Sequence, residues 1–190
     1  MDPFAPETFG ELNARDYDEH NDPGTTAAEV ALIRELAGDG RVLELASGTG
    51  RIAIPLAQAG VDISGLEASP LMVDRMREKP GGEEIPVMIG DMSKFAVDGT
   101  FDLIFLVFNT IFNLQSQEEQ IQCFVNVSKH LTSGGIFLVA AFVPDFNSFQ
   151  NNQRVGLRQK ARDSVWLDTC QHDTDQQHQE YQRDRETEEG

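Results

Sequence analysis

Two periodicities of apolar residues divide most of this chain into short segments. Runs of consecutive apolar residues are typical of strands covered on both faces, and they predict strands at 42–45, 61–66, 85–89, 101–108 and 136–143. Between these runs, apolar residues recur at every third or fourth position and predict helices at about 26–37, 50–59, 69–79 and 116–133. Strands that alternate with helices favour right-handed crossovers. The pattern therefore predicts an α/β fold, a Rossmann-like three-layer sandwich with a mainly parallel sheet.

Local signals at the helix ends support these boundaries. Ser69 and Pro70 combine an N-cap residue with proline at the first helical position. Ser116 and Glu119 have the spacing of a capping box, and Gly134 is expected to stop the helix that they open. With 190 residues, the chain is long enough for one domain with a substantial core.

The pattern weakens after residue 144. Residues 154–157 and 165–169 are candidates for short strands. From 171 to 190 the sequence contains one sizeable apolar side chain, Tyr181, so we expect a polar tail that builds no core. The C-terminal strands of the fold are therefore expected to be incomplete.

A glycine turn follows the first predicted strand. Gly48 and Gly50 lack side chains, so the backbone can turn tightly there and approach a ligand closely. The helix after the turn presents free N–H groups and the positive end of its dipole. Glu44 lies inside the strand, where an unpaired carboxylate is costly, so we expect it to orient N–H groups of the loop or a polar end of a ligand.

Three more loops are expected at the same edge, because parallel sheets bind ligands beyond the carboxyl ends of their strands. Glu67 ends the second strand, where it could accept hydrogen bonds from two ribose hydroxyls or be an ordinary exposed acid. Asp91 and Met92 follow the third strand and could bind an adenine ring or form a simple turn. Asn109 follows the fourth strand and could be a polar group near a ligand or a turn residue.

The formal net charge of -17 excludes one class of partner. A protein that binds the backbone of nucleic acid needs a basic face, so small molecules are the expected partners. Cys123 and Cys170 belong to no Cys-x-x-Cys pair, which argues against a zinc site or a disulfide framework. No apolar run reaches the ~18 residues that span a bilayer. We expect a cytoplasmic protein with no metal, no membrane span and no bound nucleic acid.

The segment 44–50, together with Glu67 and Asp91, resembles the motifs of the class I S-adenosylmethionine (SAM)-dependent methyltransferases. Ala46 stands where that family most often has glycine. The resemblance extends over about 17–143 and is greatest to members that methylate small molecules. It implies a SAM-binding site made by Tyr17, Glu44, Ala46, Ser47, Gly48, Gly50, Glu67, Ala68, Met72, Asp91, Met92, Phe108 and Asn109.

The resemblance also implies a role for each part of this set. The backbone of 46–50 would contact the methionine part of SAM, Glu67 the ribose and Asp91 the adenine. Tyr17 matches an N-terminal aromatic residue that closes over the site. SAM carries its own leaving group, so in-line displacement by a nitrogen or oxygen nucleophile needs alignment more than a base. The sequence therefore leaves the catalytic residues open.

The family likeness divides the chain into three parts. These are an N-terminal cap segment and helix at 1–40, a SAM-binding core at 41–143, and a partial substrate lobe and polar tail at 144–190. The family usually closes its sheet with an antiparallel hairpin that has no match here, so a truncated form is one interpretation. The fifth strand would then be an apolar edge, and we expect self-association through it unless 165–169 folds back to cover it.

Two other functions remain open. The spacing Gly48-x-Gly50-x-x-Ala53 also fits the dinucleotide fingerprint of NAD(P)-dependent oxidoreductases, although Glu44 would repel a pyrophosphate. The second alternative is a non-catalytic module that keeps the fold as a scaffold for binding. Detectable methyl transfer would separate it from an enzyme.

Overall fold

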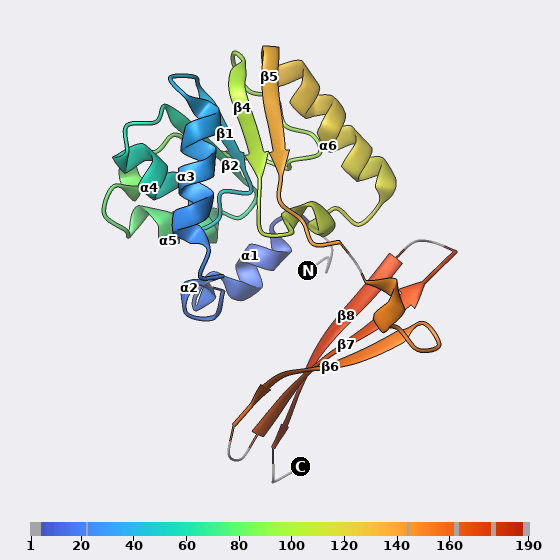
Figure 1. The fold of residues 1–190 in the computed structure, drawn as a ribbon. Helices are drawn as coiled ribbons and strands as arrows, with labels where there is room; N and C mark the ends of the chain where they lie inside the picture. Colours follow the sequence, from blue (N-terminus) through green and yellow to red (C-terminus); the bar gives the residue numbers. More distant parts are fainter. Residues whose placement is uncertain (1–4, 22, 144, 162–163, 176–177, 188–190) are drawn as a thin grey trace. The chain divides into compact units, whose positions relative to one another are not determined.

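The computed structural model describes residues 5–21, 23–143, 145–161, 164–175 and 178–187. They form two compact units that divide after residue 141. Unit 1 is built on a five-stranded sheet in the order β3-β2-β1-β4-β5, in which every pair of neighbours is parallel (Figure 1). Its strands are β1 (Val42–Leu45), β2 (Ile63–Glu67), β3 (Val87–Ile89), β4 (Phe101–Leu106) and β5 (Leu131–Val139).

Helices cover both faces of this sheet, which confirms the predicted three-layer fold (Figure 1). One apolar core contains Ile33, Leu56 and Met76 from the helices on one face, and the other contains Cys123 and Val127 from the helix on the opposite face. The main helices are α3 (Thr26–Ala37), α4 (Ala53–Gln58), α5 (Pro70–Arg77) and α6 (Gln117–His130). Shorter segments are α1 (Thr8–Asn13), α2 (Tyr17–His20), η1 (Gly82–Glu84) and η2 (Thr110–Asn113).

The predicted capping signals are confirmed. The hydroxyl of Ser69 accepts from the Met72 N–H at 3.4 Å, and Pro70 is the first residue of α5. Ser116 and Glu119 form both hydrogen bonds of the capping box, each 3.2 Å long. These bonds satisfy N–H groups that have no partner within the helix.

Two helix boundaries were predicted wrongly. α4 begins at Ala53 and not at 50, because proline is favoured only in the first turn of a helix and Pro55 is the third residue of α4. α6 ends at His130, before the glycines that were expected to stop it. Leu131 instead begins β5, where it pairs with Phe101 of β4. The sheet ladder therefore decides where this helix ends.

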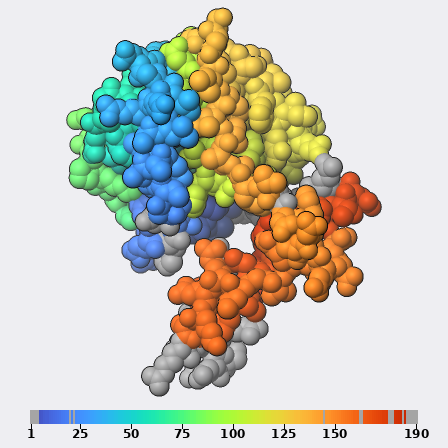
Figure 2. Space-filling model, viewed as in Figure 1, coloured from blue at the N-terminus to red at the C-terminus, as the bar shows by residue number. Residues whose placement is uncertain are grey.

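β5 is also shorter at its C-terminal end and more exposed than predicted. It ends at Val139, and Ile136 on it is 40% exposed. Among the described residues, β5 pairs with β4 alone, so one side of the strand has no neighbour in the sheet. Figure 2 shows β5 in light orange beside α6 in yellow on the surface of unit 1.

Unit 2 is a separate antiparallel sheet in the order β6-β7-β8. The candidate strands at 154–157 and 165–169 are confirmed, within longer elements. The segment that was expected to be a polar tail contains a strand, β8, which pairs with β7 over ten residue pairs. Backbone hydrogen bonds hold such a ladder without an apolar pattern. The elements are η3 (Phe146–Ser148), β6 (Gln153–Lys160), β7 (Ser164–Asp173) and β8 (His178–Thr187).

The residues 165–169 form no ladder with β5. They belong to β7, whose partners are β6 and β8. That alternative from the sequence is therefore wrong. Within the described residues, no helix is long and apolar enough to cross a membrane.

Candidate functional site

The four loops that the sequence singled out follow β1, β2, β3 and β4 at one edge of the sheet. Chain order reverses between β1 and β4, which lie side by side. Open α/β sheets bind ligands at such a reversal, beyond the carboxyl ends of the strands. The topology therefore brings together the loops at 46–50, 67–69, 90–92 and 108–113.

Three residues of the glycine loop (46–50) have a left-handed backbone. The angle φ is +53° at Ala46, +55° at Gly48 and +82° at Gly50. Gly48 and Gly50, where the sequence predicted a tight turn, are two of these residues. Glycine adopts this conformation without a penalty, whereas the Cβ of Ala46 is crowded in it. The alanine that replaces the usual glycine of the motif is therefore strained.

The two glycines of the loop serve different purposes. A Cβ atom at Gly48 would meet one atom within 4 Å, the carbonyl oxygen of Ala46 at 3.9 Å, so this side of the loop faces open space. A Cβ atom at Gly50 would lie 2.8 Å from Met76 and 2.9 Å from Ile54. Gly50 therefore allows α4 and α5 to pack closely, and Gly48 leaves room for a ligand.

Glu67 connects the glycine loop to the start of α5. Its Oε2 accepts from the Gly48 N–H at 2.8 Å, and its Oε1 accepts from the Ser69 N–H at 2.9 Å. Burial raises the pKa of Glu67, although the backbone hydrogen bonds lower it in part. Because a carboxylate oxygen can accept more than one hydrogen bond, these contacts leave Glu67 able to accept from a ligand as well.

Glu44 is more deeply buried than Glu67 and has fewer partners. Its Oε2 atom has no hydrogen-bond partner among the described residues, and neither has the hydroxyl of Ser47. Burial raises the pKa of Glu44 well above its ordinary value; Arg51 opposes this shift, and Glu67 adds to it. The unsatisfied Ser47 hydroxyl lies against Gly65 of β2, where a Cβ atom would come within 2.7 Å of it. Buried polar groups without a partner are rare in native proteins.

Asp91 forms the turn that was the alternative to a ligand contact. Its Oδ1 accepts from the N–H of Ser93 at 2.7 Å and from its hydroxyl at 2.8 Å. Its Oδ2 lies 3.8 Å from Nζ of Lys94, a loose ion pair. A role in binding adenine remains a prediction, and Oδ2 is the atom with the weaker contact.

Three other predicted residues lie largely inside the protein. Met92 is buried in the apolar core beside α6. Met72 packs near Gly10 of α1, where a side chain would clash with it, and Ala68 is partly buried. These positions favour packing for both methionines, and their contact with SAM stays a prediction.

The loop after β4 contains a second pair of left-handed residues. The angle φ is +62° at Phe108 and +65° at Asn109, and neither is a glycine. The guanidinium of Arg51 lies 5.2 Å from the centre of the Phe108 ring. Such strain persists only where the surroundings hold it, and it gathers at ligand sites. Both residues therefore remain candidates for the site.

The N-terminal segment (8–21), which contains α1 and α2, contributes Tyr17 to this edge. The ring of Tyr17 packs edge-on against Phe9 with 6.1 Å between the ring centres. Burial raises the pKa of Tyr17, Arg51 lowers it, and the negative charges of Asp18, Glu67 and Glu44 raise it further. The phenol therefore lies close enough to Glu44 and Glu67 for their charges to change its pKa. A residue that closes over the site would lie at such a distance from them.

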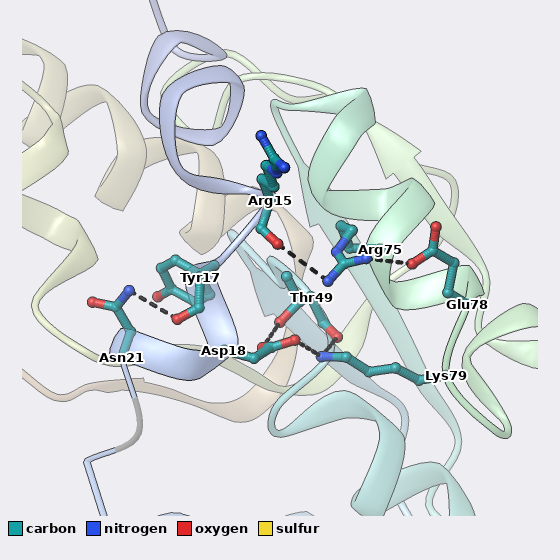
Figure 3. Close-up of polar contacts among 8 residues, drawn as sticks. All are labelled: Arg15, Tyr17, Asp18, Asn21, Thr49, Arg75, Glu78 and Lys79. Atoms are coloured by element: carbon teal, nitrogen blue, oxygen red, sulfur yellow. Dashed lines mark hydrogen bonds and ion pairs between the residues drawn. The ribbon is translucent and has the colours of Figure 1, made fainter.

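The sequence interpretation missed several residues that hold the site together. Asp18 and Lys79 contact the glycine loop at Thr49 (Figure 3). Arg51 donates to Glu29 of α3 at 2.6 Å. The signal for Asp18 was its place beside Tyr17, but neither Lys79 nor Arg51 belongs to a motif. Within the described residues, no group of His, Cys, Asp and Glu could hold a metal ion.

These residues fit a small ligand that carries hydrogen-bond donors. Glu44 and Ser47 each have a buried polar atom without a partner among the described residues, and the Cβ side of Gly48 is open. Glu67 fixes the loop that would hold the ligand. SAM has an amino group, ribose hydroxyls and an adenine amine to donate, so the donor and acceptor chemistry matches.

The chain is similar to known methyltransferases in sequence and in structure. A sequence model described as a methyltransferase domain matches residues 42–135, from β1 into β5. The cypemycin N-terminal methyltransferase of a Streptomyces species is 36% identical over 98 residues, which are 51% of this chain and 40% of that protein. The match therefore spans less than half the length of this curated relative.

Two solved structures extend the comparison to three dimensions. The CcbJ methyltransferase from Streptomyces caelestis has a TM-score of 0.83 at 29% identity, over 98% of this chain and 76% of CcbJ. The glycopeptide N-methyltransferase MtfA, solved in complex with SAM, has a TM-score of 0.60 at 22% identity, over 88% of this chain and 73% of MtfA. The second likeness shows the fold alone.

Proposed function

We propose that this chain is a class I SAM-dependent methyltransferase that transfers the methyl group of SAM to a nitrogen or oxygen atom of a small molecule, as its similarity to methyltransferases in sequence and structure supports. The observation that carries this proposal is the meeting of Gly48, Glu44 and Glu67 at the reversal of strand order. Gly48 has an open side, Glu44 is a buried acid, and Glu67 holds the glycine loop through the Gly48 N–H. A dinucleotide oxidoreductase is less favoured, because the sequence model that matches residues 42–135 describes a methyltransferase domain.

Each part of the site has a defined task in this proposal. The glycine loop, held by Glu67, would hold the methionine part of SAM, with Glu44 and Ser47 accepting its polar hydrogens. Glu67 would bind the ribose and Asp91 the adenine. SAM supplies a methyl group on a positively charged sulfur, which is its own leaving group. Tyr17 and the strained loop at Phe108 would exclude water and align the acceptor.

An amine is the acceptor that we favour. The cypemycin enzyme, which is 36% identical to this chain over 98 residues, is named as an N-terminal methyltransferase. A neutral amine carries its own lone pair and needs no base to remove a proton before it attacks. The rest of the chemistry is then alignment and exclusion of water, which the proposed roles of Tyr17 and Phe108 supply.

We further propose that the protein acts in the cytoplasm and can associate with itself. Cys123 and Cys170 are free thiols, which a reducing compartment maintains. The outer edge of β5 has no partner among the described residues, and an apolar edge strand can pair with a second chain.

Calorimetric titration of the purified chain with SAM, S-adenosylhomocysteine and NAD tests the proposed function. We expect binding of the first two and none of NAD. Incubation with SAM labelled in its methyl group and a panel of small amines and alcohols should then give labelled product. Binding without any transfer would favour the non-catalytic scaffold, and tighter binding of NAD than of SAM would overturn the cofactor assignment.

A further inference from the structure

Thr49 lies between the two glycines of the loop, and two of its atoms form hydrogen bonds with residues outside the loop. Its hydroxyl donates to Oδ1 of Asp18 at 2.6 Å, and its carbonyl oxygen accepts from Nζ of Lys79 at 2.8 Å. The same Nζ lies 2.7 Å from Oδ2 of Asp18 (Figure 3). Thr49 is itself 1% exposed. The three residues thus form a closed ring of polar contacts that joins α2, the glycine loop and the segment after α5.

We propose that Asp18 is a positioning residue that holds α2 against the glycine loop through Thr49 and so retains SAM in its site. This inference rests on the proposed function. Asp18 touches the loop on which the cofactor would lie, and it lies next to Tyr17, which would close over that cofactor. Breaking its contacts should therefore release the cofactor faster.

The chemistry of the contact suits a strong link. A hydroxyl that donates to an ionised carboxylate makes a bond of about 2.5–2.7 Å, which is the range of the Thr49 contact. Burial alone would raise the pKa of Asp18, but hydrogen bonds from Lys79 and Thr49 and the charge of Lys79 lower it below its ordinary value. Asp18 is therefore ionised near neutral pH.

The rest of the N-terminal segment is anchored without Asp18. Nη2 of Arg75 on α5 donates to the carbonyl oxygen of Arg15 at 3.2 Å. Gly10 of α1 lies so close to Ser69 that a Cβ atom at position 10 would be 2.2 Å from the Ser69 Cβ. α1 is thus fixed by packing on α5, and loss of Asp18 should free α2 while leaving the fold intact.

The link also fixes Tyr17. The phenol is within range of the charges of Glu44, Glu67 and Arg51, so its placement depends on how α2 sits on the loop. Asp18 is the residue of α2 for which contacts with the glycine loop and with Lys79 are described. It therefore acts on both the loop and the aromatic ring, although it lies outside the predicted cofactor contacts.

Stopped-flow release of S-adenosylhomocysteine tests this inference, with Asp18→Asn compared with Glu19→Gln. Glu19 is an exposed acid on the same helix and serves as the matched control. We expect Asp18→Asn to release the product about tenfold faster, the lower end of what loss of a hydrogen bond to a charged group costs. Glu19→Gln should match the parent protein, and the melting temperature without ligand should change little in either variant.

A second pair of variants tests the same link from the loop. Thr49→Val removes the hydroxyl at nearly constant shape, and Thr49→Ser retains it. We expect rapid release with valine and nearly normal release with serine. The double variant Asp18→Asn with Thr49→Val should release no faster than the faster single variant, because both remove one interaction.

The salt dependence of the release rate is an independent test. The side chains of Lys79 and Asp18 are 32% and 40% exposed, so dissolved salt can screen their attraction. Release should accelerate with salt in the parent protein and less so in Asp18→Asn. Equal release from Asp18→Asn and Glu19→Gln would overturn the inference, as would equal release from the two Thr49 variants if Asp18→Asn does not fold. Failure of the parent protein to bind S-adenosylhomocysteine would instead overturn the proposed function.

Discussion

Glu44 and Glu67 are buried acids at the same edge of the sheet, and they differ in how many of their carboxyl oxygens accept hydrogen bonds. Both oxygens of Glu67 accept from backbone N–H groups, whereas Oε2 of Glu44 has no partner in the described part of the chain. A buried carboxylate with two N–H donors can remain charged. A buried carboxyl with an unsatisfied oxygen instead favours its neutral form, so the two residues differ in their response to pH.

Replacement of Glu67 by alanine should weaken SAM binding by about 1.5–3 kcal/mol, or roughly ten- to a hundredfold. The change removes the proposed ribose contact and the acceptor that holds the Gly48 N–H. Calorimetry measures the affinity, and Glu83→Ala, an exposed acid in η1, is the control. Unchanged affinity in Glu67→Ala would remove this residue from the site.

Glu44 should make the free protein less stable as pH rises. Its pKa is raised in the folded state, so the native protein binds a proton that the unfolded chain has lost above about pH 4.3. The stabilisation is complete below the unfolded pKa and is lost as pH rises through the folded pKa. Denaturant unfolding of the parent and of Glu44→Gln from pH 4 to 8 measures it.

The glutamine variant resembles the protonated acid and cannot titrate. Relative to this variant, the parent protein should lose stability with a slope of at most about 1.4 kcal/mol per pH unit. Parallel stability curves for the two proteins would contradict the prediction.

At the scale of elements, the glycine loop shows how one residue type serves both binding and packing. Gly48 faces open space, and Gly50 faces Met76 and Ile54 between two helices. Substitution of Gly48 should therefore act mainly on binding, and the same substitution of Gly50 mainly on stability. Valine is the informative residue, because a β-branched side chain is strongly disfavoured at positive φ.

Gly48→Val should abolish SAM binding and leave the helical circular dichroism intact, with a loss of stability of about 1–3 kcal/mol from backbone strain. Gly50→Val should instead destabilise the protein by about 3 kcal/mol or more, because strain and overpacking add. Circular dichroism, thermal unfolding and calorimetry on both variants check this contrast. Normal SAM affinity in a folded Gly48→Val protein would refute the role of Gly48.

At the scale of the whole molecule, the outer edge of β5 is the feature with the largest consequence. Ile136 on β5 is 40% exposed, and Ile121 and Phe124 on the neighbouring α6 are 62% and 49% exposed. Free backbone groups beside apolar side chains are a template for pairing with another chain. We take a second copy of this chain as the partner.

Light scattering should therefore detect oligomers or aggregates at micromolar concentration. Ile136→Lys, which places a charge on the edge strand, should restore a monomer. Ile121→Lys on α6 is the matched control and should still self-associate if backbone pairing is the cause. A stable monomer of the parent protein with strong hydrogen-exchange protection across 136–143 would show that the edge is satisfied within the chain.

The amino-acid sequence was sufficient for features that depend on residues close together in the chain. The apolar periods predicted the five strands of unit 1 and its main helices, and the capping signals at Ser69 and Ser116 were correct. The tight turn predicted at Gly48 is present, with the positive φ that glycine allows. Periodicity, caps and glycine turns act over at most a few residues, so the local sequence carries their physical cause.

Tertiary structure decided the features that depend on residues far apart. The contact of Asp18 with Thr49 spans 31 positions, and that of Lys79 with Thr49 spans 30. β8 forms in a polar segment because β7 offers it a ladder of backbone partners. The missing partner of Glu44 Oε2 likewise follows from what surrounds it in space. Such contacts form between side chains and backbone groups that no local pattern brings together, so only the folded chain determines them.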